Sequence, residues 1–233
     1  VIYDYEEYFN NDSWLKSSLG QKSVVSVECD SHDNLWISTL RDGLFRYDSS
    51  SEILSKIDLP ALFEFDPAED WDISSIFLDN DDNVWLTGGA GVVRCSYSAG
   101  RLAVNGFWPV FMPLSISQDG SGRIWIGAMG ENAYYISPDD DQLHSLKALS
   151  AHFTFITSCL SLENGNVLTS AFQYGLGEID GSATHVRQLS VDENMWQDCI
   201  RRSVFVPSCM YQDSDGLVWI GTVANGLMTY DLS

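Results

Sequence analysis

A single short pattern recurs along the chain and constrains the fold more than any other feature. Each copy has an anchor residue, with an aspartate six positions before it in four copies and a glycine or aspartate three positions before it in all five. The anchors stand at positions 36, 85, 125, 168 and 219, and all are tryptophan except Leu168. Such registered self-similarity indicates one array of structural repeats. The last copy is the clearest: Asp213, Gly216, Trp219-Ile220-Gly221-Thr222, Gly226-Leu227 and Tyr230-Asp231.

Each copy is a set of short β-prone segments separated by tight turns. The anchor segments, such as Val218-Trp219-Ile220, are rich in β-branched and aromatic residues, and no helical period stands out. Four short strands in a repeat of roughly 40 to 50 residues are typical of a β-propeller blade. The sequence therefore predicts an all-β fold, a β-propeller of four-stranded blades with five repeats. We expect the anchor tryptophans to lie buried between neighbouring blades, at equivalent positions: Trp36, Trp85, Trp125 and Trp219.

The repeats together predict a single propeller domain over residues 1–233. Two arrangements are open. In the first, residues 1–9 supply a closing strand for the last repeat, which has only three strands of its own, and five blades form a closed ring. In the second, the chain is a segment of a larger, seven-bladed propeller. We favour the closed ring because closure removes exposed edge strands. The expected repeats are about 24–60, 73–108, 113–147, 154–190 and 204–233.

Composition excludes several classes of partner. The chain has 12 basic and 33 acidic residues, a net charge of −21, and so repels nucleic acid and anionic membrane surfaces. It has no apolar run long enough to span a membrane, and we expect no direct membrane contact. No C-x-x-C motif or paired histidine spacing is present, so neither a metal nor a cofactor is expected. Whether Cys199 and Cys209 form a disulfide stays open.

The pattern D-x-x-G-x-x-W-I-G-T…G-L-x-x-Y-D of the last copy resembles the two-component regulator propeller repeat. The resemblance covers nearly the whole chain. It implies the periplasmic sensor region of a hybrid two-component system, an inner-membrane protein with a histidine kinase and a response regulator. Sensors of this family recognise polysaccharide fragments and switch on genes for glycan use. The chain departs from the family in having five repeats and no kinase, regulator or immunoglobulin-like part. Signal output from this chain alone is therefore excluded.

A ligand site is expected where the loops between second and third strands meet the linkers between blades, around the central channel. Aromatic rings beside carboxylates, amides and arginines suit a sugar, because the ring stacks and the hydroxyl groups take hydrogen bonds. Some of these aromatic residues could instead seal linkers onto the propeller. The candidate ligand-binding residues are Arg41, Asp42, Trp71, Trp108, Glu131, Asn132, His152, Gln173, Tyr174, Trp196, Arg201 and Arg202.

The expected function is recognition of a carbohydrate fragment without catalysis, with homodimerisation through the parent receptor as a further expectation. Two alternatives are a propeller-fold glycosidase or lyase and a structural or dimerisation propeller with no ligand of its own. A glycosidase needs two carboxylates that face each other. The only acids in the loops between second and third strands are Asp42 and Glu131. We expect no catalytic residues.

Overall fold

The structure is a computed structural model that describes residues 19, 22–40, 42–57, 73–89, 91–129, 133–146, 155–171, 175–189, 207–222 and 226–232. These residues form nineteen strands in five sheets, four sheets with four strands and one with three. Within this part of the chain, no helix is both long and apolar enough to cross a membrane. The all-β propeller of five blades predicted from the repeats is confirmed.

Each blade is a meander in which consecutive strands pair antiparallel in chain order. Blade one contains β1 (Val24–Cys29), β2 (Leu35–Thr39), β3 (Gly43–Asp48) and β4 (Ile53–Ile57); blade two contains β5 (Ser75–Leu78), β6 (Val84–Gly88), β7 (Gly91–Ser98) and β8 (Arg101–Trp108); blade three contains β9 (Pro113–Gln118), β10 (Ile124–Ala128), β11 (Tyr134–Ile136) and β12 (Leu143–Ser145). Blade four contains β13 (Ile156–Ser161), β14 (Val167–Ala171), β15 (Gly175–Ile179) and β16 (Val186–Gln188); blade five contains β17 (Pro207–Gln212), β18 (Val218–Thr222) and β19 (Gly226–Tyr230).

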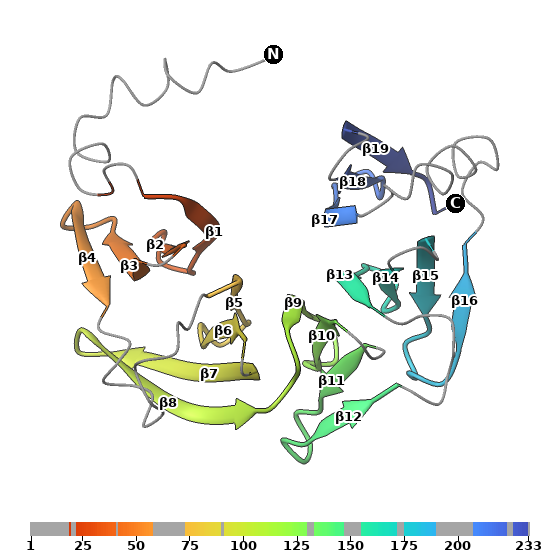
Figure 1. The fold of residues 1–233 in the computed structure, drawn as a ribbon, viewed down its shortest axis with the longest axis horizontal. Helices are drawn as coiled ribbons and strands as arrows, with labels where there is room; N and C mark the ends of the chain where they lie inside the picture. The colour runs from red at the N-terminus through yellow and green to blue at the C-terminus, as the bar shows by residue number, and fades with distance from the viewer. Residues whose placement is uncertain are drawn as a thin grey trace.

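The blades follow one another around a central axis, with the first strand of each blade innermost (Figure 1). Contacts between these inner strands join β1 to β5, β5 to β9, β9 to β13 and β13 to β17. Blade one and blade five stand at the two ends of this succession (Figure 1). Residues 1–9, which were predicted to complete the fifth sheet, lie outside the described residues, so that strand stays a prediction.

The six-residue spacing between aspartate and tryptophan has a direct physical cause. The aspartate closes the turn after the first strand, and the tryptophan lies in the second strand of the hairpin. The chain reverses over this distance and brings the indole Nε1 against the carboxylate, which accepts its hydrogen bond. The four Nε1 to Oδ2 distances are 3.3 Å for Trp36 to Asp30, 2.8 Å for Trp85 to Asp79, 2.8 Å for Trp125 to Asp119 and 2.7 Å for Trp219 to Asp213.

The position three residues before each anchor is set by backbone geometry. In every repeat this residue has a positive φ, which glycine adopts freely and aspartate tolerates. The tight turn therefore explains why the repeat alternates between these two residue types. The φ values are 61° for Asp33, 56° for Asp82, 87° for Gly122, 83° for Gly165 and 84° for Gly216.

Burial separates the last anchor from the others. Trp36, Trp85 and Trp125 are at most 2% exposed, and each packs into a hydrophobic cluster at the junction with a neighbouring blade. Trp219 has the same strand position and the same aspartate partner but is 37% exposed. The predicted equivalence of position is confirmed, and the predicted burial is wrong for Trp219. Its indole faces away from the cluster that β18 shares with blade four, and no described sheet lies beyond it.

The fourth repeat has lost its tryptophan and its aspartate together. Leu168 is fully buried, and Leu162, which replaces the aspartate, is 5% exposed beside it in the same cluster. Without an indole N–H the turn needs no carboxylate acceptor, so an apolar residue at both positions avoids an unpaired buried group. The strands β14 and β15 are buried along their whole lengths.

Candidate functional site

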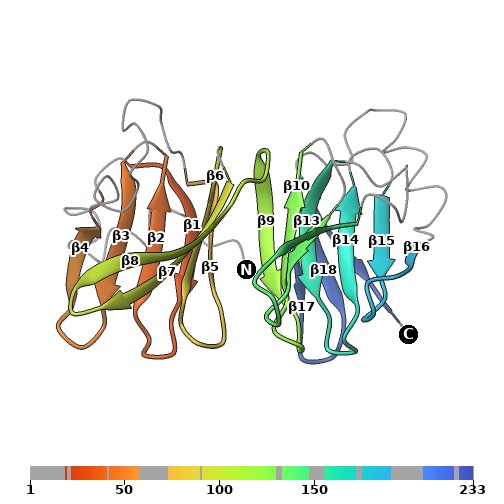
Figure 2. The same cartoon turned by 90° about the horizontal axis from the view of Figure 1, so that it is seen from below.

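The strand order gives the propeller two faces. The second strands end and the third strands begin at one end of the sheets; we call this end the loop face, and the loops that join these strands are residues 40–42, 89–90, 129–132, 172–174 and 223–225. Turns between first and second strands, and between third and fourth strands, lie at the opposite end; we call this the turn face. Figure 2 shows the hairpin turns of the successive blades gathered at the turn face.

Most of the predicted ligand-binding residues lie outside the described residues. The structure therefore does not show whether the loop face brings them together, and that grouping stays a prediction. Two of the twelve are described, Asp42 and Trp108. The others are Arg41, Trp71, Glu131, Asn132, His152, Gln173, Tyr174, Trp196, Arg201 and Arg202.

Asp42 lies in the loop between β2 and β3 and forms an ion pair. Its carboxylate accepts a hydrogen bond from Lys22 Nζ at 2.9 Å, and the two side chains are 40% and 31% exposed. The pair ties the loop to the segment that leads into β1. Asp42 is thus on the predicted face and partly accessible, with one of its oxygens already occupied.

Trp108 belongs to a blade junction and not to an open surface. It is the last residue of β8 and is 7% exposed. Its ring stacks on Trp85 with centroids 5.2 Å apart, and its Nε1 donates a hydrogen bond to the backbone oxygen of Asp141 at 3.0 Å. Trp108 therefore seals the linker onto the propeller, which was the alternative to ligand binding for the aromatic residues of the linkers. Trp108 is not placed to stack on a ligand.

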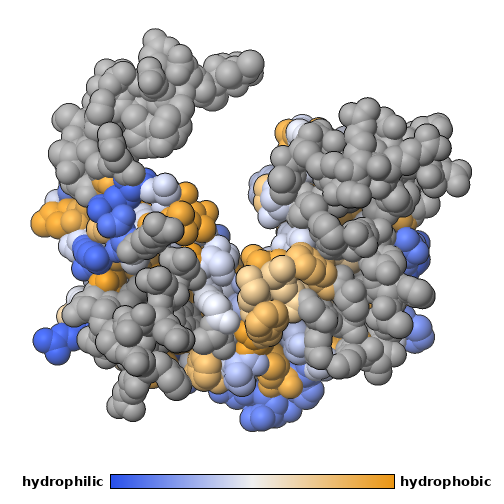
Figure 3. All heavy atoms as spheres, viewed as in Figure 1, coloured by the Kyte–Doolittle hydropathy of each residue, from blue (hydrophilic) through white to orange (hydrophobic). Residues whose placement is uncertain are grey.

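The linker between β8 and β9 presents an exposed apolar pair that the sequence reasoning did not select. Phe111 is 70% exposed and Met112 is 41% exposed, although the neighbouring Val110 is buried. Hydrophobic side chains are visible on the loop face near β9 (Figure 3). Phe111 therefore takes the place of Trp108 as the described aromatic residue that this linker offers to a ligand. The sequence signal for this pair was its position in a linker between blades, where a ligand site was expected.

A hollow lies on the turn face, between blade one and blade two. It has a volume of about 570 Å³ and combines turn residues of both blades with side chains of the junction. None of its residues is among the ligand-binding candidates selected from the sequence. The lining residues are Asp30, His32, Asp33, Asn34, Trp36, Arg46, Asp48, Ser49, Ser50, Asp82 and Tyr97. We call this hollow the turn-face cleft.

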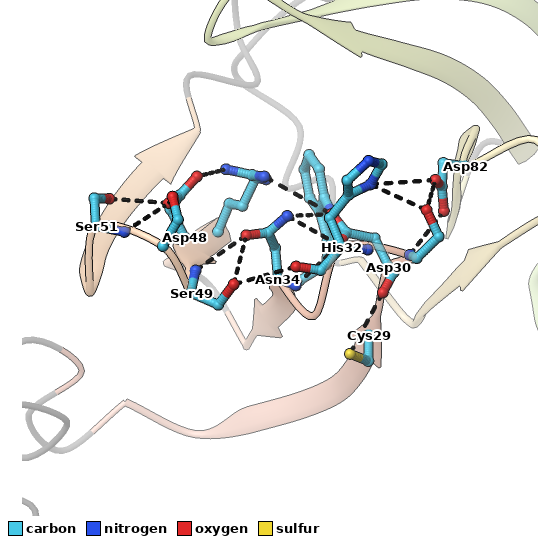
Figure 4. Close-up of polar contacts among 12 residues, drawn as sticks. Cys29, Asp30, His32, Asn34, Asp48, Ser49, Ser51 and Asp82 are labelled. Carbon is cyan, nitrogen blue, oxygen red and sulfur yellow. Dashed lines mark hydrogen bonds and ion pairs between the residues drawn. The ribbon is translucent and has the colours of Figure 1, made fainter.

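The acidic groups of the turn-face cleft are held in place by hydrogen bonds within the turns and between the turns of blades one and two (Figure 4). Asp30 accepts from the backbone N–H groups of His32 and Asn34, and Asp82 accepts from the backbone N–H of Ser31 at 3.0 Å. Burial acts to raise the pKa of Asp30, but the hydrogen bonds from Asn34, His32 and Trp36 outweigh it and lower the pKa. The cleft therefore keeps a negative charge here at neutral pH.

Arg46 forms the cationic base of the turn-face cleft. Its guanidinium lies over the rings of Trp36 and Tyr97, with its carbon 5.6 Å and 4.6 Å from the ring centroids. Its Nη1 donates to Asp48 at 3.1 Å, and its Nη2 is 3.8 Å from Asp30. Hydrogen bonds from Ser50, Ser51 and Arg46 lower the pKa of Asp48 below its usual range. The cleft can thus both donate to an oxygen and attract a cation.

The fold and its anchors define the class of protein: an all-β propeller in which four of the five blades contain an aspartate–tryptophan hairpin. One family model matches the sequence, that of the two component regulator propeller, over residues 202–224. The resemblance inferred from the repeat motif is therefore confirmed. The match falls on the last repeat, which is also the clearest copy of the motif. No curated protein matches the chain in sequence.

Solved structures share the fold at low sequence identity. The extracellular domain of a hybrid two component system from B. thetaiotaomicron is 20% identical with a TM-score of 0.65, over 89% of this chain and 27% of that one. A catalytically inactive virginiamycin B lyase from Staphylococcus aureus, solved with quinupristin, is 12% identical with a TM-score of 0.67, over 92% of this chain and 72% of that one. PorZ from Porphyromonas gingivalis is 14% identical with a TM-score of 0.62, over 89% of this chain and 32% of that one.

These likenesses establish the propeller fold and not an activity, since unrelated functions share propellers. The chain spans about a quarter of the length of the first of these structures, the hybrid two component system domain. A whole sensor of that kind therefore contains parts with no counterpart here.

Proposed function

We propose that the chain is a ligand-sensing propeller of a hybrid two-component sensor, that it lies on the periplasmic side of the inner membrane, and that it recognises an oligosaccharide or polysaccharide fragment. Signalling would pass to a kinase that is not part of this chain, and pairing of two receptors would bring two propellers together. The observation that carries the proposal is the two component regulator propeller match at residues 202–224. The extracellular hybrid two component system domain with the same fold supports the location and the sensor role.

The loop face supports carbohydrate as the ligand class. Phe111 offers an exposed ring, and Asp42 offers a partly exposed carboxylate oxygen beside the Lys22 ammonium. A sugar ring stacks on an aromatic face while its hydroxyl groups bond to such charged groups. The net charge of −21 argues against nucleic acid and anionic lipid as ligands at the same face. A sensor requires only different affinities in two receptor states, so weak binding is sufficient.

The enzyme alternative receives one specific observation in its favour and one against it. The shared fold with a virginiamycin B lyase shows that a lyase can be built on such a propeller. A glycosidase would need Asp42 and Glu131 as a facing pair of carboxylates, one of them free to transfer a proton. Asp42 is instead committed to its ion pair with Lys22 at 2.9 Å. The binding function is therefore the better supported of the two.

Calorimetry with a panel of glycan fragments tests this proposal. We expect one fragment class to bind, and the Phe111→Ala variant to bind it about 2- to 10-fold more weakly because a stacking ring is lost. Tyr211→Ala is the matched control, since Tyr211 is an aromatic residue of β17 that is 65% exposed. Chromatography of the same samples should show the fragments unchanged. Shortened fragments that disappear with Glu131→Gln would support the enzyme, and equal losses in both aromatic variants would remove Phe111 from the site.

A further inference from the structure

The outer strand of blade two is longer than the outer strands described in the other blades. β8 has eight residues, compared with five in β4 and three each in β12 and β16. It lies on the outside of the propeller (Figures 1 and 2), and within the described part of the chain β7 is the only strand that pairs with it. A long unpaired edge can add a further strand, and proteins commonly avoid this by keeping edge strands short. The edge of β8 is therefore open to β-pairing.

The hairpin of β7 and β8 shows which backbone groups are free at this edge. The two strands are joined by the two-residue turn Ala99-Gly100, whose residues have positive φ values of 51° and 77°. The residues on either side of such a turn, Ser98 and Arg101, form a hydrogen-bonded pair, and the two kinds of pair then alternate along the hairpin. Leu102 and Val104 fall at non-hydrogen-bonded positions. Their N–H and C=O groups therefore point away from β7, toward the open edge.

The sequence around this hairpin is free of acidic residues. Residues 83–118, which include β7 and β8, contain no aspartate or glutamate, and no other stretch of the chain without an acid is as long. Two copies of a chain with a net charge of −21 repel each other over most of their surfaces. The β7–β8 hairpin is therefore a place where two copies can meet without bringing acidic strands together.

The residues of β8 are complementary to a second copy of the same strand. In an antiparallel pair centred on Ala103, Leu102 lies opposite Val104 of the second copy, and the outward backbone groups of both residues bond to each other. The exposed Ala103 then lies opposite itself at a close, non-hydrogen-bonded position, which suits its small side chain. Arg101 lies opposite Asn105, so the two arginines do not face each other.

The same register brings an acidic group of blade three within reach of Arg101 of the other copy. Arg94 donates through Nε to the side chain of Asn105 at 3.2 Å and through Nη1 and Nη2 to Asp141, whose side chain is 50% exposed. Arg101 pairs with Ser98, which shares a face of β7 with Arg94 because the two are four residues apart. Arg101 of the second copy, beside Asn105, is therefore on the same face as Asp141, and opposite charges meet at both ends of the contact.

We propose that β8 pairs with β8 of a second copy of this chain, antiparallel about a twofold axis at Ala103, and so joins two four-stranded sheets into one sheet of eight strands. A twofold contact of this kind uses the same patch on both copies. The proposal names the surface for the pairing of receptors that is part of the proposed function, and it rests on that function only in this respect. Its test uses no glycan, so the ligand sensing and the β8 pairing can each fail alone.

Sedimentation velocity of the full chain at about 0.15 M salt, where long-range repulsion is screened, measures the pairing. We expect a weak dimer with a Kd of about 10 to 100 μM, because one strand pair buries less than the roughly 1,200 Å² of a standard interface. Val104→Pro should weaken the dimer about tenfold or more, because proline removes an outward N–H that the β7–β8 ladder does not use. Tyr211→Ala is the control, since Tyr211 is an exposed aromatic residue of β17, and it should stay within about twofold of the native chain.

Cysteine crosslinking is a second measurement that places the contact. Ala103→Cys sets two thiols opposite each other on the twofold axis, with a Cα separation of about 4.5 Å that a disulfide can span. Under mild oxidation we expect dimers in which both linked peptides contain position 103. Mass spectrometry identifies these peptides, which is necessary because Cys29 and Cys209 are also exposed. Ser55→Cys, an exposed position in the outer strand β4 of blade one, is the matched control and should form about tenfold less dimer.

The register has a check of its own. Arg101→Cys mixed with Asn105→Cys should give crosslinks between the two variants, and Arg101→Cys should not link to itself. The proposal is overturned if the native chain sediments as a monomer at about 0.5 mM, far above the expected Kd. It is also overturned if the proline variant and its control weaken the dimer equally, if Ala103→Cys crosslinks no more than its control, or if Arg101→Cys links to itself.

Discussion

Replacing Trp125 by alanine should lower the free energy of unfolding by about 3 to 5 kcal/mol, the usual cost of deleting a large aromatic core residue. Trp125 is fully buried in a cluster with Ile156, Cys159 and Val167 of blade four, so the loss opens a cavity between two blades. The deletion also removes the 2.8 Å hydrogen bond that its Nε1 donates to Asp119. Urea unfolding followed by circular dichroism measures the effect.

Trp219→Ala is the matched control for this prediction. Trp219 has the same strand position and donates to Asp213 at 2.7 Å, but it is 37% exposed. Its loss leaves little cavity and should cost about 1 to 2 kcal/mol, mainly from lost apolar contact. Equal destabilisation of the two variants would show that the junctions between blades do not carry the stability of the array.

Replacing Asp119 by alanine should also cost about 3 to 5 kcal/mol, as when one partner of a buried ion pair is removed. The Asp119 side chain is 2% exposed and accepts from Arg123 Nε at 2.7 Å and from Trp125 Nε1 at 2.8 Å. It also accepts from the backbone N–H groups of Ser121 and Arg123, so the variant leaves several donors without an acceptor. Urea unfolding at neutral pH measures the loss.

The pH dependence of the same variant gives an independent check. Burial acts to raise the pKa of Asp119, but hydrogen bonds from Ser121 and Trp125 and the charge of Arg123 outweigh it and lower the pKa. Because the folded pKa is below the unfolded one, this contribution is present above about pH 4 and is lost as the pH falls through the folded pKa. The native chain should therefore lose stability more steeply below about pH 4 than Asp119→Ala does. Parallel pH profiles would contradict this role for Asp119.

The repeat made the blades predictable because its constraints are local. All three constraints lie within one hairpin. An aspartate closes the turn, the residue three positions later has a positive φ, and the indole three positions after that donates a hydrogen bond to the aspartate. Asp119, Gly122 and Trp125 show this arrangement with the predicted spacing. The paired replacement of aspartate and tryptophan by Leu162 and Leu168 follows the same local rule.

What the sequence did not reveal depends on the neighbouring blade. Trp219 has the same spacing to its aspartate as the other tryptophan anchors, but no described sheet packs against its indole, which is 37% exposed. Arg46 and Arg94 lie at equivalent positions in their hairpins, but their carboxylate partners differ: Arg94 bonds to Asp141 of the next blade, and Arg46 pairs with Asp48 and Asp30 of its own blade. Trp108 was assigned to a linker because the end of β8 could not be fixed, and it proved to fill a junction.

Hydrogen exchange of the chain, with and without the glycan fragment that binds most tightly, tests the sensor proposal most directly. Bound ligand slows exchange at the backbone groups it covers or rigidifies. We predict protection at the loop face, in residues 40–42, 109–112, 129–132 and 172–174, with the fragment recovered intact. Protection confined to the turns at residues 30–34 and 79–83, no protection at all, or a shortened fragment would contradict recognition of carbohydrate at the loop face.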